Sequence, residues 1–264
     1  MPELPDVETY RRYASARVLH QRIAGIHMES PKLLKGTTAA GLGRVLKGRT
    51  FESTRRHGKY LLLALDSGGW LVLHFGMSGE LKYIRDRHDT PAYTRLLISF
   101  DNGHHLAYVA PRKLGRISLA DTPRALKDEK DLGPDALALT EEQFLELTAG
   151  RRGGVKAWLM DQQNMAGIGN VYSDEILFQA GIHPGAAVNG MGKADLRRLY
   201  EKMHAVLRAA IAARADPERM PAGFLLPHRR RGERCPKCGS ALASTRSGGR
   251  TAWYCPACQK RRRR

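Results

Sequence analysis

The chain begins Met1-Pro2-Glu3-Leu4-Pro5-Asp6-Val7-Glu8-Thr9, and the rest of the sequence is organised around this stretch. If Met1 is removed, Pro2 carries a free secondary amine, and three carboxylates follow it on what is expected to be the start of a helix. An α-amino group titrates near pH 7.7–8.0, so roughly a tenth of it is neutral at pH 7 and able to form imines. Acidic residues in a first helical turn also simply complement the helix dipole. The stretch alone therefore leaves open a catalytic N-terminus and an ordinary helix start.

The composition indicates a polyanionic partner. The 264 residues include 44 Lys and Arg against 26 Asp and Glu, which gives a formal net charge of +18. The terminal run 260–264 supplies five of these positive charges, so most of the excess is spread through the rest of the chain. Each neutralised phosphate releases counterions and favours association, so nucleic acid is the expected partner. A membrane-surface or ribosomal protein remains the alternative.

The apolar pattern argues against a membrane protein and against a secreted one. No apolar run approaches the 18 or so residues that a membrane-spanning helix needs. Acidic residues come early in the chain, and no apolar core of a signal peptide follows them. We therefore expect an intracellular, soluble protein. A cytoplasmic, nucleoid-associated location and a monomeric state are further expectations that do not rest on this pattern.

Residue periodicity predicts a leading helix, a β-rich half and a helical half. Apolar residues at helical spacing predict a helix over residues 5–20. Short β-like runs between turn residues predict an antiparallel sandwich or barrel, with strands at 60–65, 70–75, 96–100 and 105–109. A charged connection is expected at 121–140, and helical periodicity returns at 140–148, 155–163, 171–180 and 193–213.

Four cysteines define an expected metal site near the end of the chain. Cys235 and Cys238 form one Cys-Pro-x-Cys knuckle, and Cys255 and Cys258 form the other. This spacing fits the two-knuckle zinc template, and four thiolates suit a closed structural Zn²⁺ site. The segment 244–251 between the knuckles is expected to be an arginine-bearing hairpin tip, suited to a phosphate or a narrow groove.

Two further stretches have the composition of phosphate-binding sites. In the Gly-Ile-Gly-Asn run, Gly167 and Gly169 would let backbone approach a ligand closely, and Asn170 would cap a helix whose N–H groups face an anion. An ordinary connection between two helices is the alternative. Lys59 comes just before an expected strand, where it either points into a groove or is a solvated edge lysine.

Seven motifs in order resemble the formamidopyrimidine-DNA glycosylase / endonuclease VIII family, and the resemblance covers Pro2 to about Gln259. The motifs are PELPDVET (2–9), GKYLL (58–62), GMSG (76–79), LGP (132–134), GIGN (167–170), GIHP (181–184) and the four-cysteine finger. The resemblance implies an α+β multidomain fold with DNA between its domains. The implied domains are an N-terminal β-sandwich with a leading helix (1–130), a helix-two-turn-helix domain (131–228), and a zinc finger with a basic tail (229–264).

The resemblance also implies an activity, that of a bifunctional DNA glycosylase and abasic-site lyase of base excision repair. Its partner would be double-stranded DNA with a damaged base or an abasic site. Pro2 would attack the sugar C1′, Glu3 would be the acid/base partner, and Lys59 would be a catalytic-site cation on a phosphate. The implied DNA-binding residues are Met77, Arg112 and Leu114, which would fill the space left by the flipped base, Asn170 and Arg250, which would grip phosphates, and Lys156 and Glu175, which would lie near the phosphates or the pocket.

The sequence departs from the oxidised-guanine branch of that family in two places. Ala110, Lys113 and Leu114 stand where the branch usually has an acid, a second arginine and an aromatic wedge. Loss of the aromatic removes a stacking surface worth about 1–3 kcal/mol per base. The stretch between residue 213 and Cys235 is also shorter than the branch's base-capping insert. We therefore expect low selectivity for 8-oxoguanine and tolerance of other lesions.

Two readings compete with the enzyme. One is a damaged-DNA-binding protein that keeps the fold and has lost catalysis. The other is a zinc-ribbon protein of the ribosome or of transcription, which leaves the first nine residues unexplained. Phosphate binding alone would not require Pro2 to follow Met1 directly, so the sequence favours the enzyme.

Overall fold

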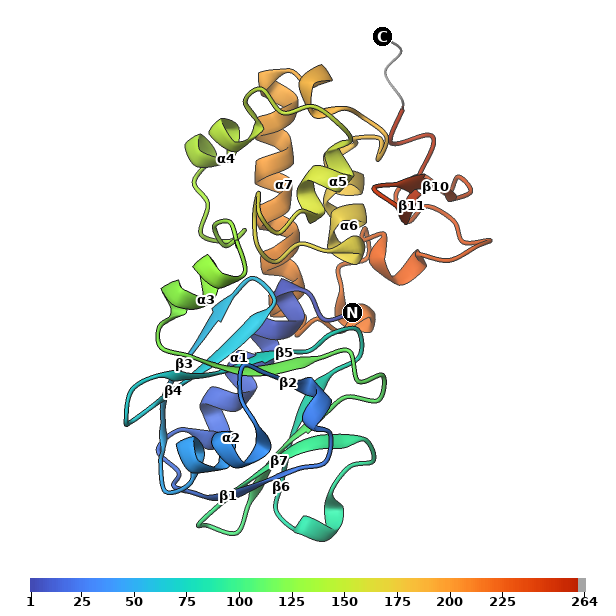
Figure 1. Ribbon diagram of the computed structural model, residues 1–264. Helices are drawn as coiled ribbons and strands as arrows, with labels where there is room; N and C mark the ends of the chain where they lie inside the picture. Colours follow the sequence, from blue (N-terminus) through green and yellow to red (C-terminus); the bar gives the residue numbers. More distant parts are fainter. Residues whose placement is uncertain (261–264) are drawn as a thin grey trace. The chain divides into compact units, whose positions relative to one another are not determined.

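The computed structural model describes residues 1–260, and its internal contacts divide the chain into two units. Unit 1 comprises residues 1–2 and 6–130, and unit 2 comprises residues 3–5 and the chain from Asp131 onward. Helix α1 (Leu4–Val18) therefore starts among the residues of unit 2 and continues in unit 1 (Figure 1).

Unit 1 is built on two β-sheets. One has the strand order β1-β7-β8-β6 and the other the order β2-β9-β5-β4-β3. The pairs are antiparallel apart from the short parallel pairing of β2 with β9. The strands are β1 (Ile23–Met28), β2 (Leu34–Lys35), β3 (Phe51–His57), β4 (Tyr60–Leu65), β5 (Trp70–His74), β6 (Glu80–Ile84), β7 (Thr94–Phe100), β8 (His105–Val109) and β9 (Arg116–Ala120).

The core of unit 1 takes side chains from both sheets and from α1. On α1 the residues Val7, Ala14 and Val18 are fully buried, which is the spacing of one helical face. They share a hydrophobic cluster with buried residues of β4 and β5 in one sheet, of β7 and β8 in the other, and of helix α2 (Ala39–Leu46). The expected β-sandwich with a leading helix is confirmed.

A short helix, α3 (Pro123–Glu129), lies where the sequence predicted only a charged connection. The hydroxyl of Thr122 accepts a hydrogen bond from the backbone N–H of Ala125, and Pro123 occupies the first turn, so the helix is capped locally. Its one buried residue, Leu126, packs on Leu62 and Val72. The packing of Leu126 thus helps to stabilise a helix whose mostly polar sequence shows no apolar periodicity.

Unit 2 contains helices and a two-stranded hairpin. Its elements are α4 (Glu141–Thr148), α5 (Val155–Met160), α6 (Asn170–Ala180), α7 (Lys193–Ala212), β10 (Ala243–Ser247) and β11 (Arg250–Tyr254). Figure 1 shows the long α7 beside α6, and both helices supply buried side chains to one hydrophobic cluster. Leu4, at the start of α1, belongs to the same cluster. The helix expected over 155–163 ends at Met160, before the turn at 161–164.

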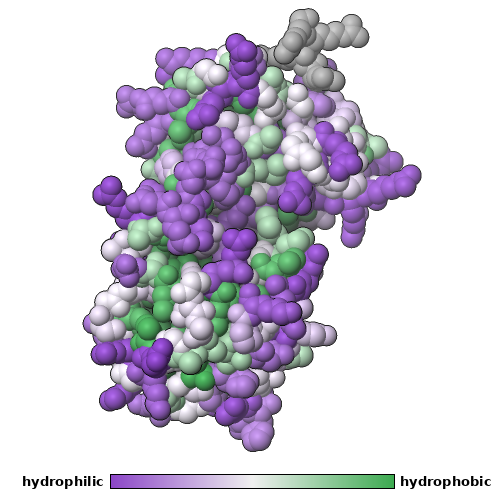
Figure 2. Space-filling model, in the orientation of Figure 1, coloured by the Kyte–Doolittle hydropathy of each residue, from purple (hydrophilic) through white to green (hydrophobic). Residues whose placement is uncertain are grey.

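The surface matches the charged composition. Figure 2 shows hydrophilic residues over most of the visible face, with small hydrophobic patches between them. Within residues 1–260, no helix has both the length and the hydropathy that a membrane span requires.

One histidine of unit 1 is held in its neutral form. His74 ends β5, its Nδ1 accepts a hydrogen bond from the N–H of Gly76 at 3.3 Å, and its ring lies 4.9 Å from that of Tyr60. Burial and, to a smaller extent, the positive charges of Lys59 and Arg116 together lower the pKa of His74 to about 4. The folded protein therefore favours the uncharged imidazole.

The pKa of His74 predicts a loss of stability in acid. Because the folded pKa lies below the ordinary 6.5, this stabilisation is complete above pH 6.5 and is lost as the pH falls toward 4, by roughly 3 kcal/mol. His74→Gln should therefore flatten the fall in unfolding free energy between pH 6.5 and 4, measured by denaturant titration. The exposed His88→Gln should leave it unchanged. Equal slopes for His74→Gln and the parent protein would contradict this account.

Candidate functional site

The carboxylate of Glu3 lies against the first turn of α6. Its Oε2 accepts hydrogen bonds from the N–H of Gly169 at 2.7 Å and of Tyr172 at 3.2 Å, and its Oε1 accepts one from Val171 at 2.8 Å. A helix start leaves N–H groups unsatisfied and carries a positive partial charge, so it attracts a carboxylate. Glu3 is fully buried, and the helix therefore fixes its orientation.

Two glycines make room for this contact. A Cβ on Gly169 would lie 2.5 Å from the carboxyl carbon of Glu3, and a Cβ on Gly167 would lie 2.6 Å from Cδ1 of Leu4. The N–H of Leu4 also donates to the carbonyl of Gly167 at 3.0 Å. The sequence assigned these glycines to the close approach of a ligand. In the structure, the group that approaches them is the chain's own N-terminal segment.

Asn170 does not cap α6, and that expectation was wrong. The N-cap residue is Gly169, which has no side chain that could bond the helix. Asn170 is the first helical residue. The carboxylate of Glu3 already takes the N–H groups that a capping side chain would accept. Within residues 1–260, the Oδ1 of Asn170 is buried without a hydrogen-bond partner. The amide oxygen of Asn170 is therefore a buried acceptor whose hydrogen-bonding capacity is not satisfied within residues 1–260.

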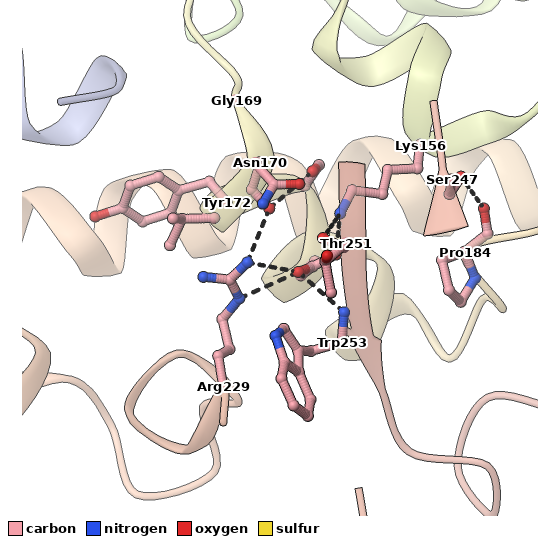
Figure 3. Close-up of polar contacts among 12 residues, drawn as sticks. Lys156, Gly169, Asn170, Tyr172, Pro184, Arg229, Ser247, Thr251 and Trp253 are labelled. Carbon is pink, nitrogen blue, oxygen red and sulfur yellow. Dashed lines mark hydrogen bonds and ion pairs between the residues drawn. The ribbon is translucent and has the colours of Figure 1, made fainter. Parts of the chain in front are cut away.

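One helical turn beyond Asn170, the side chain of Asp174 joins three segments of unit 2, whose residues Lys156, Arg229 and Trp253 are labelled in Figure 3. Its Oδ1 accepts a hydrogen bond from Nζ of Lys156 at 2.5 Å. Its Oδ2 accepts from Nη2 of Arg229 at 2.7 Å and from the N–H of Trp253 at 3.1 Å. Nζ of Lys156 also donates to the carbonyl of Thr251 at 3.2 Å. Helices α5 and α6, strand β11 and the chain at Arg229 therefore meet at one carboxylate.

Lys156 is part of the interior. It has no exposed surface, and burial lowers its pKa while the charge of Asp174 opposes that change. The resemblance assigned Lys156 to the phosphates or the pocket, whereas its ammonium group pairs with Asp174 inside unit 2. Neither Asp174 nor Arg229 was predicted from the sequence as a site residue. The available signal was an acidic pair, Asp174 and Glu175, within a largely apolar helical run, since buried charges need partners.

Glu175, also fully buried, holds the short segment that follows α7. Its Oε2 accepts from the N–H of Leu226 at 2.7 Å, and its Oε1 accepts from the amide of Gln179 at 2.7 Å. The same amide of Gln179 donates to the carbonyl of Gly223 at 2.9 Å. Burial raises the pKa of Glu175, and these hydrogen bonds oppose the shift. The segment around 223–226 is therefore fastened to α6.

The four cysteines form the expected metal centre. Their sulfur atoms all lie within 4.8 Å of one another, with 3.8 Å between Cys235 and Cys258 and 3.5 Å between Cys238 and Cys255. Tetrahedral Zn²⁺ with Zn–S bonds of about 2.3 Å places its sulfurs about 3.8 Å apart. The donor set and its spacing fit a structural Zn²⁺, as the sequence predicted.

The finger hairpin is fixed at its tip and along β11. Ser247 donates from its hydroxyl to the carbonyl of Pro184 at 3.0 Å (Figure 3), and a Cβ on Gly248 would meet that of Ala157 at 3.0 Å. Arg250 lies opposite Ser247 in the pairing of β10 with β11 at this tip, and its side chain is exposed. The basic run 261–264 of the expected tail lies outside the described residues.

In unit 1, the turn that precedes Lys59 is tied to α1. Nε of Arg56 lies 3.4 Å from the carboxylate of Glu8, and its Nη1 donates to the carbonyl of Gly58 at 3.2 Å. Burial alone would raise the pKa of Glu8, but hydrogen bonds from Arg11 and the neighbouring arginine charges outweigh it and lower that pKa. Lys59 is only 9% exposed, which excludes the solvated edge lysine.

The residues expected to fill the flipped-base space are exposed. Met77 is 40% and Leu114 50% exposed, and Arg112 is exposed as well. A Cβ on Gly76 would lie 2.4 Å from the carbonyl carbon of Leu114, so the absence of a side chain at Gly76 allows the two loops to meet. By contrast, Ala110, at the start of the loop that carries Arg112 and Leu114, is buried.

Pro2 is half-buried, and Met1 precedes it with 48% of its surface exposed. Pro2 is bonded directly to Glu3, whose carboxylate is fixed on α6. The residue that the family resemblance implies as the nucleophile is thus the immediate sequence neighbour of a residue whose carboxylate is held on a helix start.

The chain is similar to known proteins along almost its whole length. Family models described as the formamidopyrimidine-DNA glycosylase N-terminal domain, the formamidopyrimidine-DNA glycosylase H2TH domain, and a zinc finger found in FPG and IleRS match residues 1–117, 132–220 and 232–261. Proteins named formamidopyrimidine-DNA glycosylase from Desulfitobacterium hafniense and Xanthomonas campestris are 35% and 36% identical, over 98% of this chain and 100% of theirs.

Solved structures show the same similarity. Lactococcus lactis Fpg has been solved in complexes with DNA that contains an abasic site and with DNA that contains Fapy-dG. Each resembles this chain with a TM-score of 0.88 and 28% identity, over 98% of this chain and 100% of the other.

The contact between Gly169 and Glu3 predicts a large effect of one methyl group. Gly169→Ala should lower the free energy of unfolding by about 1–3 kcal/mol, because the Cβ collides with the Glu3 carboxylate. Thermal or denaturant unfolding measures this effect. Gly190→Ala is the matched control, since nothing lies within 4 Å of a Cβ there, and it should change stability by less than about 0.5 kcal/mol. Equal effects of the two substitutions would contradict the proposed packing.

Proposed function

Because the chain belongs to the formamidopyrimidine-DNA glycosylase family, we propose that it excises damaged bases from double-stranded DNA and then cleaves the strand at the abasic site. A DNA glycosylase of base excision repair follows from the family. The lyase step, the lesion preference, a monomeric state and association with the nucleoid are our proposals. The single observation that supports the lyase step best is the fixed carboxylate of Glu3 next to Pro2.

In the proposed reaction, the amine of Pro2 attacks C1′ of the damaged nucleotide. The N–C1′ bond forms as the glycosidic bond breaks, and the base leaves with the bonding electrons and takes up a proton. The amine loses its proton and the sugar ring opens, which gives an iminium ion, the Schiff base. Loss of a C2′ proton then expels the 3′ phosphate, and a second elimination expels the 5′ phosphate. Glu3 would carry protons in these steps.

This mechanism has a chemical precondition. An amide nitrogen is not nucleophilic, so Pro2 can attack only after Met1 has been removed and its amine is free. An intact-mass measurement of the purified protein would show whether Met1 is present.

We propose that the exposed cations and the polar turn residue bind the DNA. Arg112 and Arg250 are exposed, and Lys59 lies in a turn that is anchored to α1. Asn170 has a buried amide oxygen without a partner in residues 1–260, consistent with a side chain whose interactions are completed by a ligand. Met77 and Leu114 would fill the space of the flipped base. For Lys156 and Glu175, burial supports a role in positioning rather than contact with phosphate.

We also propose weak discrimination for 8-oxoguanine. The segment around 223–226 is short and is fastened to α6 by Glu175 and Gln179, which supports a base pocket without a long cap. A pocket with fewer hydrogen bonds to the base edge discriminates less between lesions.

Weak discrimination between lesions predicts that different damaged bases are excised at similar rates. In single-turnover assays, 8-oxoguanine opposite cytosine should be excised no faster than a formamidopyrimidine or an oxidised pyrimidine in the same duplex. The prediction fails if 8-oxoguanine opposite cytosine is clearly the fastest substrate.

Borohydride reduction tests the lyase step, because it converts a Schiff base to a stable adduct. The mature protein should be trapped on abasic DNA, and Pro2→Gly and Glu3→Gln should reduce trapping by at least about 10²-fold, the usual contribution of positioned acid–base groups. Val45→Asn, an exposed position on α2, should be trapped normally. Tight binding to abasic DNA without any adduct would instead support a non-catalytic damaged-DNA-binding protein.

A further inference from the structure

Tyr93 is the most exposed large hydrophobic side chain in residues 1–260, at 59%. Its backbone has φ +64°, in the left-handed region that bulky residues rarely adopt. The fold gains little burial from the ring, yet it maintains a backbone conformation that costs free energy. This combination of an exposed ring and a strained backbone is not expected of a tyrosine that only faces solvent.

The surrounding backbone fixes this conformation. The carbonyl of Tyr93 accepts a hydrogen bond from the N–H of Ala110 at 3.0 Å, just beyond the pairing of β7 with β8. The next residue, Thr94, donates from its N–H and its hydroxyl to the carbonyl of Pro91, at 3.3 and 2.7 Å. Tyr93 is thus presented from a closed turn at the end of a strand.

A buried arginine supports the ring. The guanidinium carbon of Arg95 lies 5.6 Å from the centre of the Tyr93 ring. Arg95 is itself fixed, because Nη1 donates to both oxygens of Glu29 at 2.7 and 2.6 Å and Nε donates to the carbonyl of Ala110 at 3.1 Å. The cation–π contact therefore comes from a side chain that cannot swing away freely.

Tyr93 is connected to the loop of unit 1 that carries the proposed DNA-binding residues. Ala110, its hydrogen-bond partner, begins the loop that continues through the exposed Arg112 and Lys113 to Leu114. The backbone of Leu114 packs on Gly76, next to Met77. An exposed aromatic ring whose backbone is hydrogen-bonded to the start of a loop with exposed cations suits a partner with flat faces and negative charge.

We infer that Tyr93 is a further DNA-binding residue, whose ring stacks on a base that loses its stacking partner when the damaged nucleotide leaves the helix. The inference rests on the proposed function, since it needs DNA with a displaced nucleotide. Leu114 offers no aromatic face, and Tyr93 supplies one from the adjacent turn. Every base has a π-face, so this contact tolerates any sequence.

Two substitutions of Tyr93 separate the role of the ring from that of the backbone. Asparagine tolerates the left-handed region well, so Tyr93→Asn removes the ring and keeps the turn, and its melting temperature should equal or exceed that of the parent protein. Tyr93→Phe keeps the stacking face. Val45→Asn removes a different exposed apolar side chain and is the matched control.

Binding is measured with the mature protein on duplexes that contain a tetrahydrofuran abasic analogue, with 2-aminopurine placed in turn opposite and beside it. Tyr93→Asn should bind about tenfold more weakly than the parent protein, while Tyr93→Phe and Val45→Asn should bind within about twofold. At one or more positions the fluorescence of 2-aminopurine should be quenched by the parent protein and by Tyr93→Phe, and remain bright with Tyr93→Asn.

Unchanged affinity and unchanged quenching in Tyr93→Asn, with normal binding by the parent protein, would overturn the inference and leave the proposed function intact. Weaker binding by Tyr93→Asn together with a lower melting temperature and no change in quenching would also overturn it, because the residue would then act only through the fold. Failure of the parent protein to bind or to form the borohydride adduct would overturn the proposed function, and the inference with it.

Discussion

The contact between the Glu3 carboxylate and the first turn of α6 is the constraint on which the rest of the site depends. It joins residues 166 positions apart in sequence and sets the direction in which the N-terminal residues leave the helix. It requires a glycine at Gly169, and the neighbouring Leu4 contact requires one at Gly167, so two motifs at a distance in sequence form a single structural feature. The residue that follows the proposed nucleophile is therefore held by a helix N-terminus.

Helix α6 serves this arrangement along its length. Its start holds Glu3, the buried Asp174 one turn later holds Lys156 and strand β11, and Glu175 holds the segment after α7. A charge buried without its partner costs several kcal/mol, so this network stabilises one arrangement of α5, α6 and the finger. The exposed Arg250 begins strand β11, so its position depends on that network and on the zinc site.

Local patterns in the sequence predicted most of the elements. The helical spacing of Val7, Ala14 and Val18 and the knuckle spacing of the cysteines each have a local physical cause, so they were visible without a structure. The capping of α6 by Glu3 was not visible, because nothing local distinguishes a carboxylate that stays in solvent from one that docks on a distant helix. The same holds for Asp174. Helix α3 does have local start signals, the cap Thr122 and the first-turn Pro123, but it is short and buries only Leu126, so its apolar pattern is too weak to predict it.

The central claim is that the N-terminal amine of Pro2, positioned through Glu3, is the group that attacks the sugar. Mass spectrometry of the peptide that carries the reduced DNA adduct tests it most directly. The account predicts that the adduct lies on the α-nitrogen of an N-terminal peptide that begins at Pro2. An adduct on a lysine such as Lys59, with the N-terminal peptide unmodified, would contradict it.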